Sequence, residues 1–221
     1  MTQRLPITNP RSAVMDCCWS AELEDTLIDR GCRACDLGFQ ENINGCCVMR
    51  GDHGSKVMIV GEAPGKEEDS RRKPFTGPAG QLMDKIFMSV GLNTNDFYCT
   101  NVVLCRPVAP WEATKQNLTP KRDQIDRCKP YLNRQIQLVD PRIIITIGGI
   151  ATATILNKNT IKINDYRGKL LQENNRLVFP MIHPAAILHA SREPAKMLDY
   201  KQKTWADIQK LKTILVEEKL I

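Results

Sequence analysis

Apolar residues occur along this chain in short continuous runs, which alternate with longer segments where apolar residues recur at helical spacing. Four runs have strand length and are rich in β-branched residues: 56–60, 97–104, 142–147 and 177–182. The run at 142–147 has the unbroken β-branched character of a strand buried on both faces of a parallel sheet. The runs therefore predict a sheet of four strands.

The spacing of apolar positions between and beyond these runs predicts helices at 20–30, 78–90, 121–139, 148–156 and 195–219. Strands that alternate with helices indicate the α/β class, and we expect a three-layer α/β/α sandwich around a central, mainly parallel four-stranded sheet. Residues 1–20 show no period, which predicts an irregular N-terminal arm. A single domain then covers 21–221.

Composition sets the outer limits of function. The chain has 221 residues, of which 42% are hydrophobic, enough for one sizeable core. Lys and Arg total 31 against 25 Asp and Glu, and this net charge of +6 favours anionic partners such as nucleic acid without specifying one. No apolar run approaches the ~20 residues of a membrane span, and the N-terminus lacks the apolar core of a signal peptide. We expect a cytoplasmic protein.

Nine cysteines in such a protein favour metal binding or redox chemistry over a disulfide framework. Cys32 and Cys35 form a C-x-x-C pair, which suits two thiolates that converge on one metal centre. Cys105 and Cys128 are each followed by a cation and a proline, and they complete a candidate set of four ligands. The other five cysteines are interpreted as structural by default: Cys17, Cys18, Cys46, Cys47 and Cys99. They remain competitors for the site, because the Cys46–Cys47 pair is only a loop away from Cys35 in the sequence.

Three strand ends carry candidate chemistry. The first strand stops at Gly61, and Pro64 and Gly65 stiffen the turn that follows, which is either a ligand-binding loop or ordinary punctuation. Asn101 lies in the second strand, where it is either a polar group that needs partners or a turn residue at the strand end. His183 follows the fourth strand and precedes a proline, so it is a catalytic candidate or a structural histidine.

Residues 70–80 place three cations before an aromatic residue that proline and glycine flank. Phe75 is either a satellite core residue or a stacking platform for a base. The cations Arg71, Arg72 and Lys73 are either a solvated surface or part of that platform.

Four stretches in this order resemble the motifs of the family 4 uracil-DNA glycosylases: GEAPGKEED at 61–69, PFTGPAGQL at 74–82, TNVVLCRP at 100–107 and HPAA at 183–186. The similarity covers roughly 32–189. It implies a [4Fe-4S] cluster on Cys32, Cys35, Cys105 and Cys128. It also implies a monofunctional DNA repair enzyme that hydrolyses the N-glycosidic bond of uracil in DNA, with no cofactor in the chemical step.

The resemblance gives roles to the strand-end residues, because this cleavage passes through a sugar cation and a uracil anion. His183 is expected to donate a hydrogen bond to uracil O2, together with backbone N–H groups of the Glu62–Ala63 turn. Phe75 is expected to stack on the flipped base. Asn101 is expected to donate to uracil O4 and accept from N3–H, which cytosine cannot match.

The turn itself has further implied roles. Gly61 and Gly65 shape it, and Ala63 and Glu68 lie near the edge where thymine carries its methyl group. The turn has no Asp to act as general base, so Glu62 or Glu68 is left to orient the attacking water, or the sugar cation needs little help.

The implied partner is DNA that contains uracil, single- or double-stranded, bound by a monomer. Five cations are candidates for phosphate contacts: Arg71, Arg72, Lys73, Arg106 and Arg167. The chain has His189 where many relatives carry an arginine. Two alternatives stay open, namely an enzyme for another base, such as hypoxanthine or a 5-substituted uracil, and a protein that binds uracil-DNA without turnover.

Overall fold

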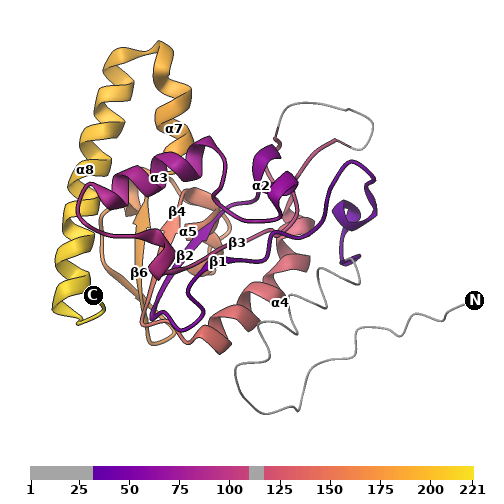
Figure 1. Cartoon of the computed structure of the whole chain (residues 1–221), viewed down its shortest axis with the longest axis horizontal. Coiled ribbons are helices and arrows are strands. Elements are labelled where there is room, and N and C mark those ends of the chain that lie inside the picture. Colours follow the sequence, from indigo (N-terminus) through magenta and orange to yellow (C-terminus); the bar gives the residue numbers. More distant parts are fainter. Residues whose placement is uncertain (1–31, 110–116) are drawn as a thin grey trace, which may run out of the picture.

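Six strands form one mixed sheet, in the order β1-β3-β2-β4-β6-β5, in a computed structural model that describes residues 32–109 and 117–221 (Figure 1). The strands are β1 (Arg50–Gly51), β2 (Val57–Gly61), β3 (Tyr98–Asn101), β4 (Ile143–Ile147), β5 (Leu171–Glu173) and β6 (Arg176–Met181). The four central strands are parallel, and β1 and β5 pair antiparallel at the two edges. The α/β class and the four parallel strands agree with the prediction. The edge strands are additions, since two or three residues are too short to give a periodic signal.

Strand β3 is shorter than its apolar run predicts. The run covers 97–104, but the strand ends at Asn101 because its neighbour β2 ends at Gly61, directly opposite in the register. The N–H groups of Val102 and Val103 still donate to the carbonyls of Gly61 and Glu62, at 2.9 and 3.0 Å. The chain therefore leaves the sheet while its side chains stay in the core.

Helices cover both faces of the sheet. They are α2 (Lys66–Arg71), α3 (Pro78–Met88), α4 (Arg122–Val139), α5 (Gly149–Ile155), α6 (Ile163–Tyr166), α7 (Pro184–His189) and α8 (Pro194–Glu217), with 3-10 turns η1 (Asp36–Phe39), η2 (Thr94–Asp96) and η3 (Ala190–Arg192). The four helices predicted after residue 77 are confirmed to within two residues at each end. The arm at 1–20 and the helix at 20–30 lie outside the described residues. No helix in the described part of the chain is long and apolar enough to cross a membrane.

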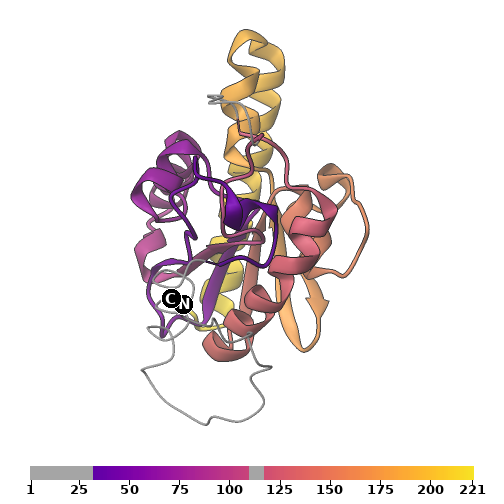
Figure 2. The same cartoon turned by 90° about the vertical axis from the view of Figure 1, so that its right-hand side faces the viewer.

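Alternate residues of the central strands serve two separate cores. In β2, Met58 and Val60 belong to the core beneath α4 and α5, whereas Val57 and Ile59 belong to the core beneath α3 and α8. Figures 1 and 2 show α4 on one side of the sheet and α3 with α8 on the other. Because both faces are covered, the central strands are mostly apolar, and polar residues within them such as Thr100 and Thr146 are buried.

The carboxyl ends of the parallel strands meet at one edge of the sheet, and the chain leaves them toward opposite faces. It continues from β2 to α3 on one face, and from the adjacent β4 to α5 on the other. A topological switch point therefore lies between β2 and β4, which is where ligands bind in open α/β sheets. The residues that follow β2, β3, β4 and β6 border this edge.

A buried ion pair fastens α8 to the segment that precedes β5. Arg167 donates from Nε to Asp207 Oδ2 at 2.8 Å and from a terminal nitrogen to Oδ1 of the same carboxylate. The side chains are only 17% and 3% exposed. Burial raises the pKa of Asp207, and the Arg167 charge opposes that rise. Since this guanidinium is already occupied, the phosphate contact predicted for Arg167 is not supported by its geometry.

We expect Arg167→Ala to destabilise the fold, because it leaves the Asp207 carboxylate buried without its partner. Removing one member of a buried pair typically costs about 3–5 kcal/mol. Urea unfolding measures the loss. The matched control is Arg122→Ala, which breaks an ion pair with Asp126 whose side chains are 63% and 53% exposed, and which should cost less than about 1 kcal/mol. Equal losses in the two variants would contradict this role for Arg167.

Candidate active site

A glycine, an amide and an aromatic ring meet at the carboxyl ends of β2 and β3. Gly61 and Asn101 are register partners in the sheet. A Cβ atom on Gly61 would lie 2.4 Å from Asn101 Oδ1 and 2.6 Å from Phe75 Cζ, so only glycine leaves room for both side chains. Gly61, Asn101 and Phe75, three of the residues that the sequence predicts to bind a base, thus form one contact group.

The Asn101 carboxamide is almost buried, with 3% of the residue exposed. No hydrogen-bond partner for this carboxamide is found among the described residues, and neither of its polar atoms is completely enclosed. A buried amide normally finds partners in the protein, because leaving it unpaired costs about 1–3 kcal/mol. The interpretation of Asn101 as a group that requires an external partner is therefore favoured over that of a turn residue.

The loop that carries Phe75 is held in an unusual backbone conformation. Phe75 has φ +57, in the left-handed region, and the ring is 7% exposed. A Cβ on Gly80 would lie 2.1 Å from the Phe75 carbonyl oxygen, so the first turn of α3 can approach this loop only at a glycine. The sequence prediction gave Gly80 no role, because close backbone approach has no periodic signature.

Glu68 braces the same loop. Its Oε1 accepts from the N–H of Gly77 at 2.8 Å, at the N-terminus of α3, where a carboxylate is also favoured by the helix dipole. Its other oxygen lies against Gly65, since a Cβ there would be 2.7 Å from Oε2. Glu68 therefore joins the turn after β2 to the helix that follows Phe75.

His183 follows β6 and caps α7. Its Nδ1 accepts from the N–H of Ala185 at 3.1 Å, so in the neutral ring the proton is on Nε2, which becomes a hydrogen-bond donor. Burial lowers the pKa of His183 to about 4, with a smaller contribution from His189. A Cβ on Gly148, the residue after β4, would lie 3.2 Å from His183 Cβ, which fixes the imidazole against the neighbouring strand end. No hydrogen bond or ring contact joins His183 to Phe75 or Asn101 among the described residues.

The turn after β2 offers donors and a carboxyl group. The N–H groups of Glu62 and Ala63 have no acceptor within the described part of the chain, whereas the Glu62 carbonyl accepts from Val103. The Glu62 side chain is half-buried, and burial raises its pKa. The sequence predicts that the two N–H groups bind an anion and that the Glu62 carboxyl group is a candidate to orient water.

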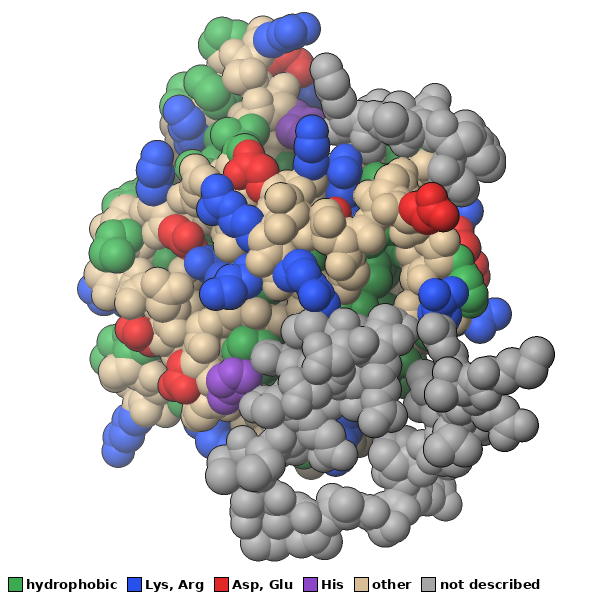
Figure 3. All heavy atoms as spheres, turned by 45° about the vertical axis from the view of Figure 1, so that its right-hand side comes forward, with side chains coloured by type: hydrophobic (Ala, Val, Ile, Leu, Met, Phe, Trp, Pro, Cys, Tyr) green, Lys and Arg blue, Asp and Glu red, His purple; other side chains and the backbone are tan. Residues whose placement is uncertain are grey.

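The predicted phosphate-binding cations divide into two groups. Arg71 and Lys73 are exposed, and Arg71 makes only a loose ion pair with Glu67, at 3.9 Å. Arg72 is half-buried against Gly45. Arg106 is 6% exposed, and its Nε donates to Asn117 at 2.8 Å, so it lies too deep to reach a phosphate in this conformation. Figure 3 shows Lys and Arg side chains across the middle of the face on which α2 lies.

The four predicted metal ligands belong to one hydrophobic core cluster or pack against it. Cys32 and Cys35 precede η1, Cys105 follows β3, and Cys128 lies on the buried side of α4. Cys128 and Cys35 interact electrostatically with Cys32. All four are free thiols.

Polar groups of the protein contact these sulfurs. The Leu104 N–H donates to Cys128 Sγ at 3.4 Å, and the Cys32 thiol donates to the Tyr131 hydroxyl at 4.0 Å. Burial raises the pKa of Cys35, and the backbone N–H groups of Leu37 and Gly38 oppose that rise. Such N–H···S contacts are typical of thiolates that hold an iron–sulfur cluster. The described residues contain no group of three or more His, Cys, Asp or Glu side chains placed to hold a single metal ion. The donor set fits the cluster.

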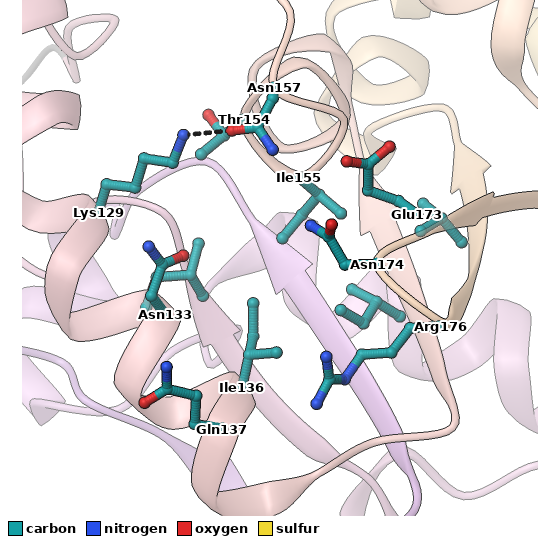
Figure 4. Close-up of a pocket in the computed structure, with 13 residues that line it drawn as sticks. Lys129, Asn133, Ile136, Gln137, Thr154, Ile155, Asn157, Glu173, Asn174 and Arg176 are labelled. Atoms are coloured by element: carbon teal, nitrogen blue, oxygen red, sulfur yellow. Dashed lines mark hydrogen bonds between the residues drawn. The ribbon is translucent and has the colours of Figure 1, made fainter.

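Two hollows in the described part of the chain are lined by residues other than Gly61, Phe75 and Asn101. A cavity of about 330 Å³ lies between α4, the end of α5 and the β5–β6 hairpin, where Lys129 donates to Asn157 at 2.6 Å (Figure 4). A more open hollow of about 400 Å³ lies behind His183, between α7 and the start of α8, and includes His189, Lys196 and Tyr200. The second hollow adjoins the predicted site, whereas the first does not.

Comparison with known proteins supports the same region. The chain matches the Uracil DNA glycosylase superfamily over residues 48–209, which includes every strand end described above. It is 39% identical over 169 residues to a type-4 uracil-DNA glycosylase of Saccharolobus solfataricus, covering 72% of this chain and 74% of that relative. A type-4 uracil-DNA glycosylase of Sulfurisphaera tokodaii is 40% identical over 143 residues, with 61% and 62% coverage. One from Thermotoga maritima is 29% identical over 188 residues, with 85% and 91% coverage.

We expect Gly61→Ala to disable the site while leaving the fold intact. Strand backbone accepts alanine, but its methyl group would displace the Asn101 amide and the Phe75 ring. We expect the variant to lose binding of a labelled oligonucleotide, measured by fluorescence anisotropy, and to lose catalytic turnover. Its circular dichroism spectrum should stay unchanged. The control is Gly54→Ala, which meets only the Asp52 carboxylate at 3.6 Å. Normal activity of Gly61→Ala would remove the contact group from the site.

Proposed function

The chain belongs to the Uracil DNA glycosylase superfamily, and from that premise we propose that it is a DNA repair enzyme that hydrolyses the N-glycosidic bond of uracil in DNA and leaves an abasic site. The premise rests on a match to nearly three quarters of the sequence and on relatives named type-4 uracil-DNA glycosylase. What this chain adds is a set of residues whose geometry suits each part of that reaction.

The observation that carries the proposal is the Asn101 amide beside Phe75, for which the described residues offer no hydrogen-bond partner. Uracil presents an acceptor at O4 and a donor at N3–H, which match the NH₂ and the carbonyl of one carboxamide. Cytosine presents the reverse pattern and would leave both ends of Asn101 mispaired. Sites that require such hydrogen bonds reject the wrong partner by roughly 10⁴–10⁵. Phe75 provides the face on which the base stacks.

Departure of the base requires stabilisation of a uracil anion. Neutral His183 donates through Nε2–H toward O2 from the end of β6. The N–H groups of Glu62 and Ala63, which have no acceptor among the described residues, follow β2, and β4 lies between these two strands. A neutral donor is suitable, because an imidazolium at this depth would cost desolvation energy before any charge develops on the base. His183 after β6 and the backbone N–H groups after β2 therefore both donate hydrogen bonds to the departing base.

Water attack on the sugar cation needs little activation, since the cation is strongly electrophilic. Glu62 is the carboxylate that orients this water in our proposal, because its raised pKa makes it a better proton acceptor. Glu68 acts mainly through the loop, since its carboxylate already accepts from Gly77. Ala63 is the residue beside the edge where thymine carries a methyl group.

The base reaches this edge only after leaving the DNA helix, which costs a few kcal/mol and is cheapest for a mispaired U·G. Arg71 and Lys73 are exposed and are our candidates for phosphate contacts, together with the half-buried Arg72 between them in the sequence. Such contacts weaken as salt increases.

We further propose that Cys32, Cys35, Cys105 and Cys128 hold a [4Fe-4S] cluster. Its role is structural, and it supplies no step of the hydrolysis. The thiolates tie the segment before η1 to the chain after β3 and to α4. Hydrogen bonds also join this segment to α4, since Gln124 donates to Asp36 and Arg127 donates to the Ala34 carbonyl.

The experiment is an assay on oligonucleotides with U·G, U·A, single-stranded U, hypoxanthine or 5-hydroxymethyluracil, followed by alkali. We expect strand breaks at uracil, and a rate lower by about 10²–10³ in His183→Ala, the usual loss for one donor to a developing anion. His183→Gln, which keeps an N–H donor, should lose less. Breaks only at the other bases, or a shifted adduct without breaks, would overturn the assignment.

The pH profile of the same reaction tests the charge of His183. Because its pKa in the folded protein is about 4 and not the ordinary 6.5, the ring stays neutral throughout pH 5–8. We expect no loss of rate near pH 6.5 from this group, and a decline only as pH approaches 4. An inflection near pH 6.5 that disappears in His183→Gln would show that the ring is charged.

Asn101→Asp tests base reading. A carboxylate accepts but does not donate, so it keeps the contact to N3–H and repels O4. We expect uracil excision to fall by at least about 10-fold, and any gain to appear on cytosine. Asn101→Ala serves as the control for simple loss of the amide. Unchanged preference for uracil in Asn101→Asp would remove this residue from recognition.

A further inference from the structure

A fifth thiol lies among the four expected cluster ligands. Cys46 is 2% exposed and lies between η1 and β1. Its Sγ is 3.4 Å from Cys105 Sγ. It also interacts with Cys32 and, more weakly, with Cys128. The interpretation of Cys46 as a structural cysteine by default does not account for this position.

The neighbouring backbone holds Cys46 beside Cys105. The N–H of Cys47 donates to the carbonyl of Leu104 at 2.7 Å, so the two chain segments are joined one residue away from each thiol. The Cys47 side chain turns the other way and contacts the Glu68 carbonyl at 3.2 Å. The two adjacent cysteines thus have different surroundings, and only Cys46 faces the expected ligands.

The spacing of the two sulfurs has a direct consequence for metal binding. A thiolate binds a metal at about 2.3 Å, as in zinc sites. Two sulfurs that are 3.4 Å apart can therefore both reach the same metal atom, and one can replace the other with little movement. Cys35 and Cys128 have no comparable neighbour within the described residues.

We propose that Cys46 and Cys105 are interchangeable ligands of one iron of the cluster. The inference rests on the cofactor part of the proposed function. Exchange involves no oxidation: the incoming thiol loses a proton as its S–Fe bond forms, and the outgoing thiolate takes up a proton as its bond breaks. The chain therefore has five thiols for four positions, and loss of either Cys46 or Cys105 leaves a complete set.

The test is the iron and acid-labile sulfide content of the purified full chain, with its absorbance near 400 nm, for Cys105→Ala, Cys46→Ala and the double variant. We expect both single variants to keep the cluster and the double variant to lose iron at least about 10-fold. The single substitution Cys35→Ala should be enough to remove the cluster, because no other thiol among the described residues lies close enough to replace Cys35. Cys47→Ala is the matched control, since it removes an adjacent buried thiol that faces away, and it should keep the cluster.

Loss of iron in Cys105→Ala to the level of the double variant would overturn the proposal. Cys105→Ser and its combination with Cys46→Ala repeat the comparison at nearly unchanged volume, in case alanine prevents folding. A wild-type chain without iron would overturn both this inference and the cofactor assignment. Uracil excision by that same preparation would leave the proposed enzymatic function standing, so the failures are distinguishable.

Discussion

The site depends on the pairing of β2 with β3 on one side and with β4 on the other. Both pairings are parallel and in register, so the strands end at one level and their last residues become neighbours. This alignment sets Gly61 opposite Asn101 and lets the chain leave β2 and β4 toward opposite faces. A shift of one residue would turn Asn101 to the other face of the sheet and separate it from Phe75. The backbone hydrogen bonds of the sheet therefore determine which residues become neighbours in the site.

The segment with the cysteines supports this edge from outside. Buried Asp69 of α2 accepts two hydrogen bonds from Asn44, at 3.0 and 2.7 Å. The Cys47 thiol contacts the same helix at Glu68, and the Cys47 N–H binds the carbonyl of Leu104 beyond β3. A centre held by Cys32 and Cys105 would thus stiffen the loops that carry the catalytic turn. We infer that such a centre acts on the reaction through positioning and not through electron transfer.

The distribution of charge suits the two activities proposed for the enzyme, which are cleavage at the strand ends and binding of the phosphate backbone. The groups at the strand ends are neutral or buried, as with His183, whose pKa is depressed by its surroundings. Cations lie on the outer face, where a phosphate backbone would pass (Figure 3). The buried pair of Arg167 and Asp207 belongs to neither task, and it stabilises the long C-terminal helix. Positive charge is therefore exposed at Lys73 and buried in an ion pair at Arg167.

The sequence by itself determined the α/β class, the four parallel strands and the main helices, because local runs and periodicity carry that information. It also identified Gly61, Asn101 and His183, since each interrupts or ends an apolar run. Tertiary structure determined the contacts between residues that are far apart in the sequence. It joined Arg167 to Asp207, made Glu68 a brace on Gly77, and brought Cys46 to Cys105 across 59 residues. Such contacts have no local signature, because they arise only when separate segments pack against the same sheet.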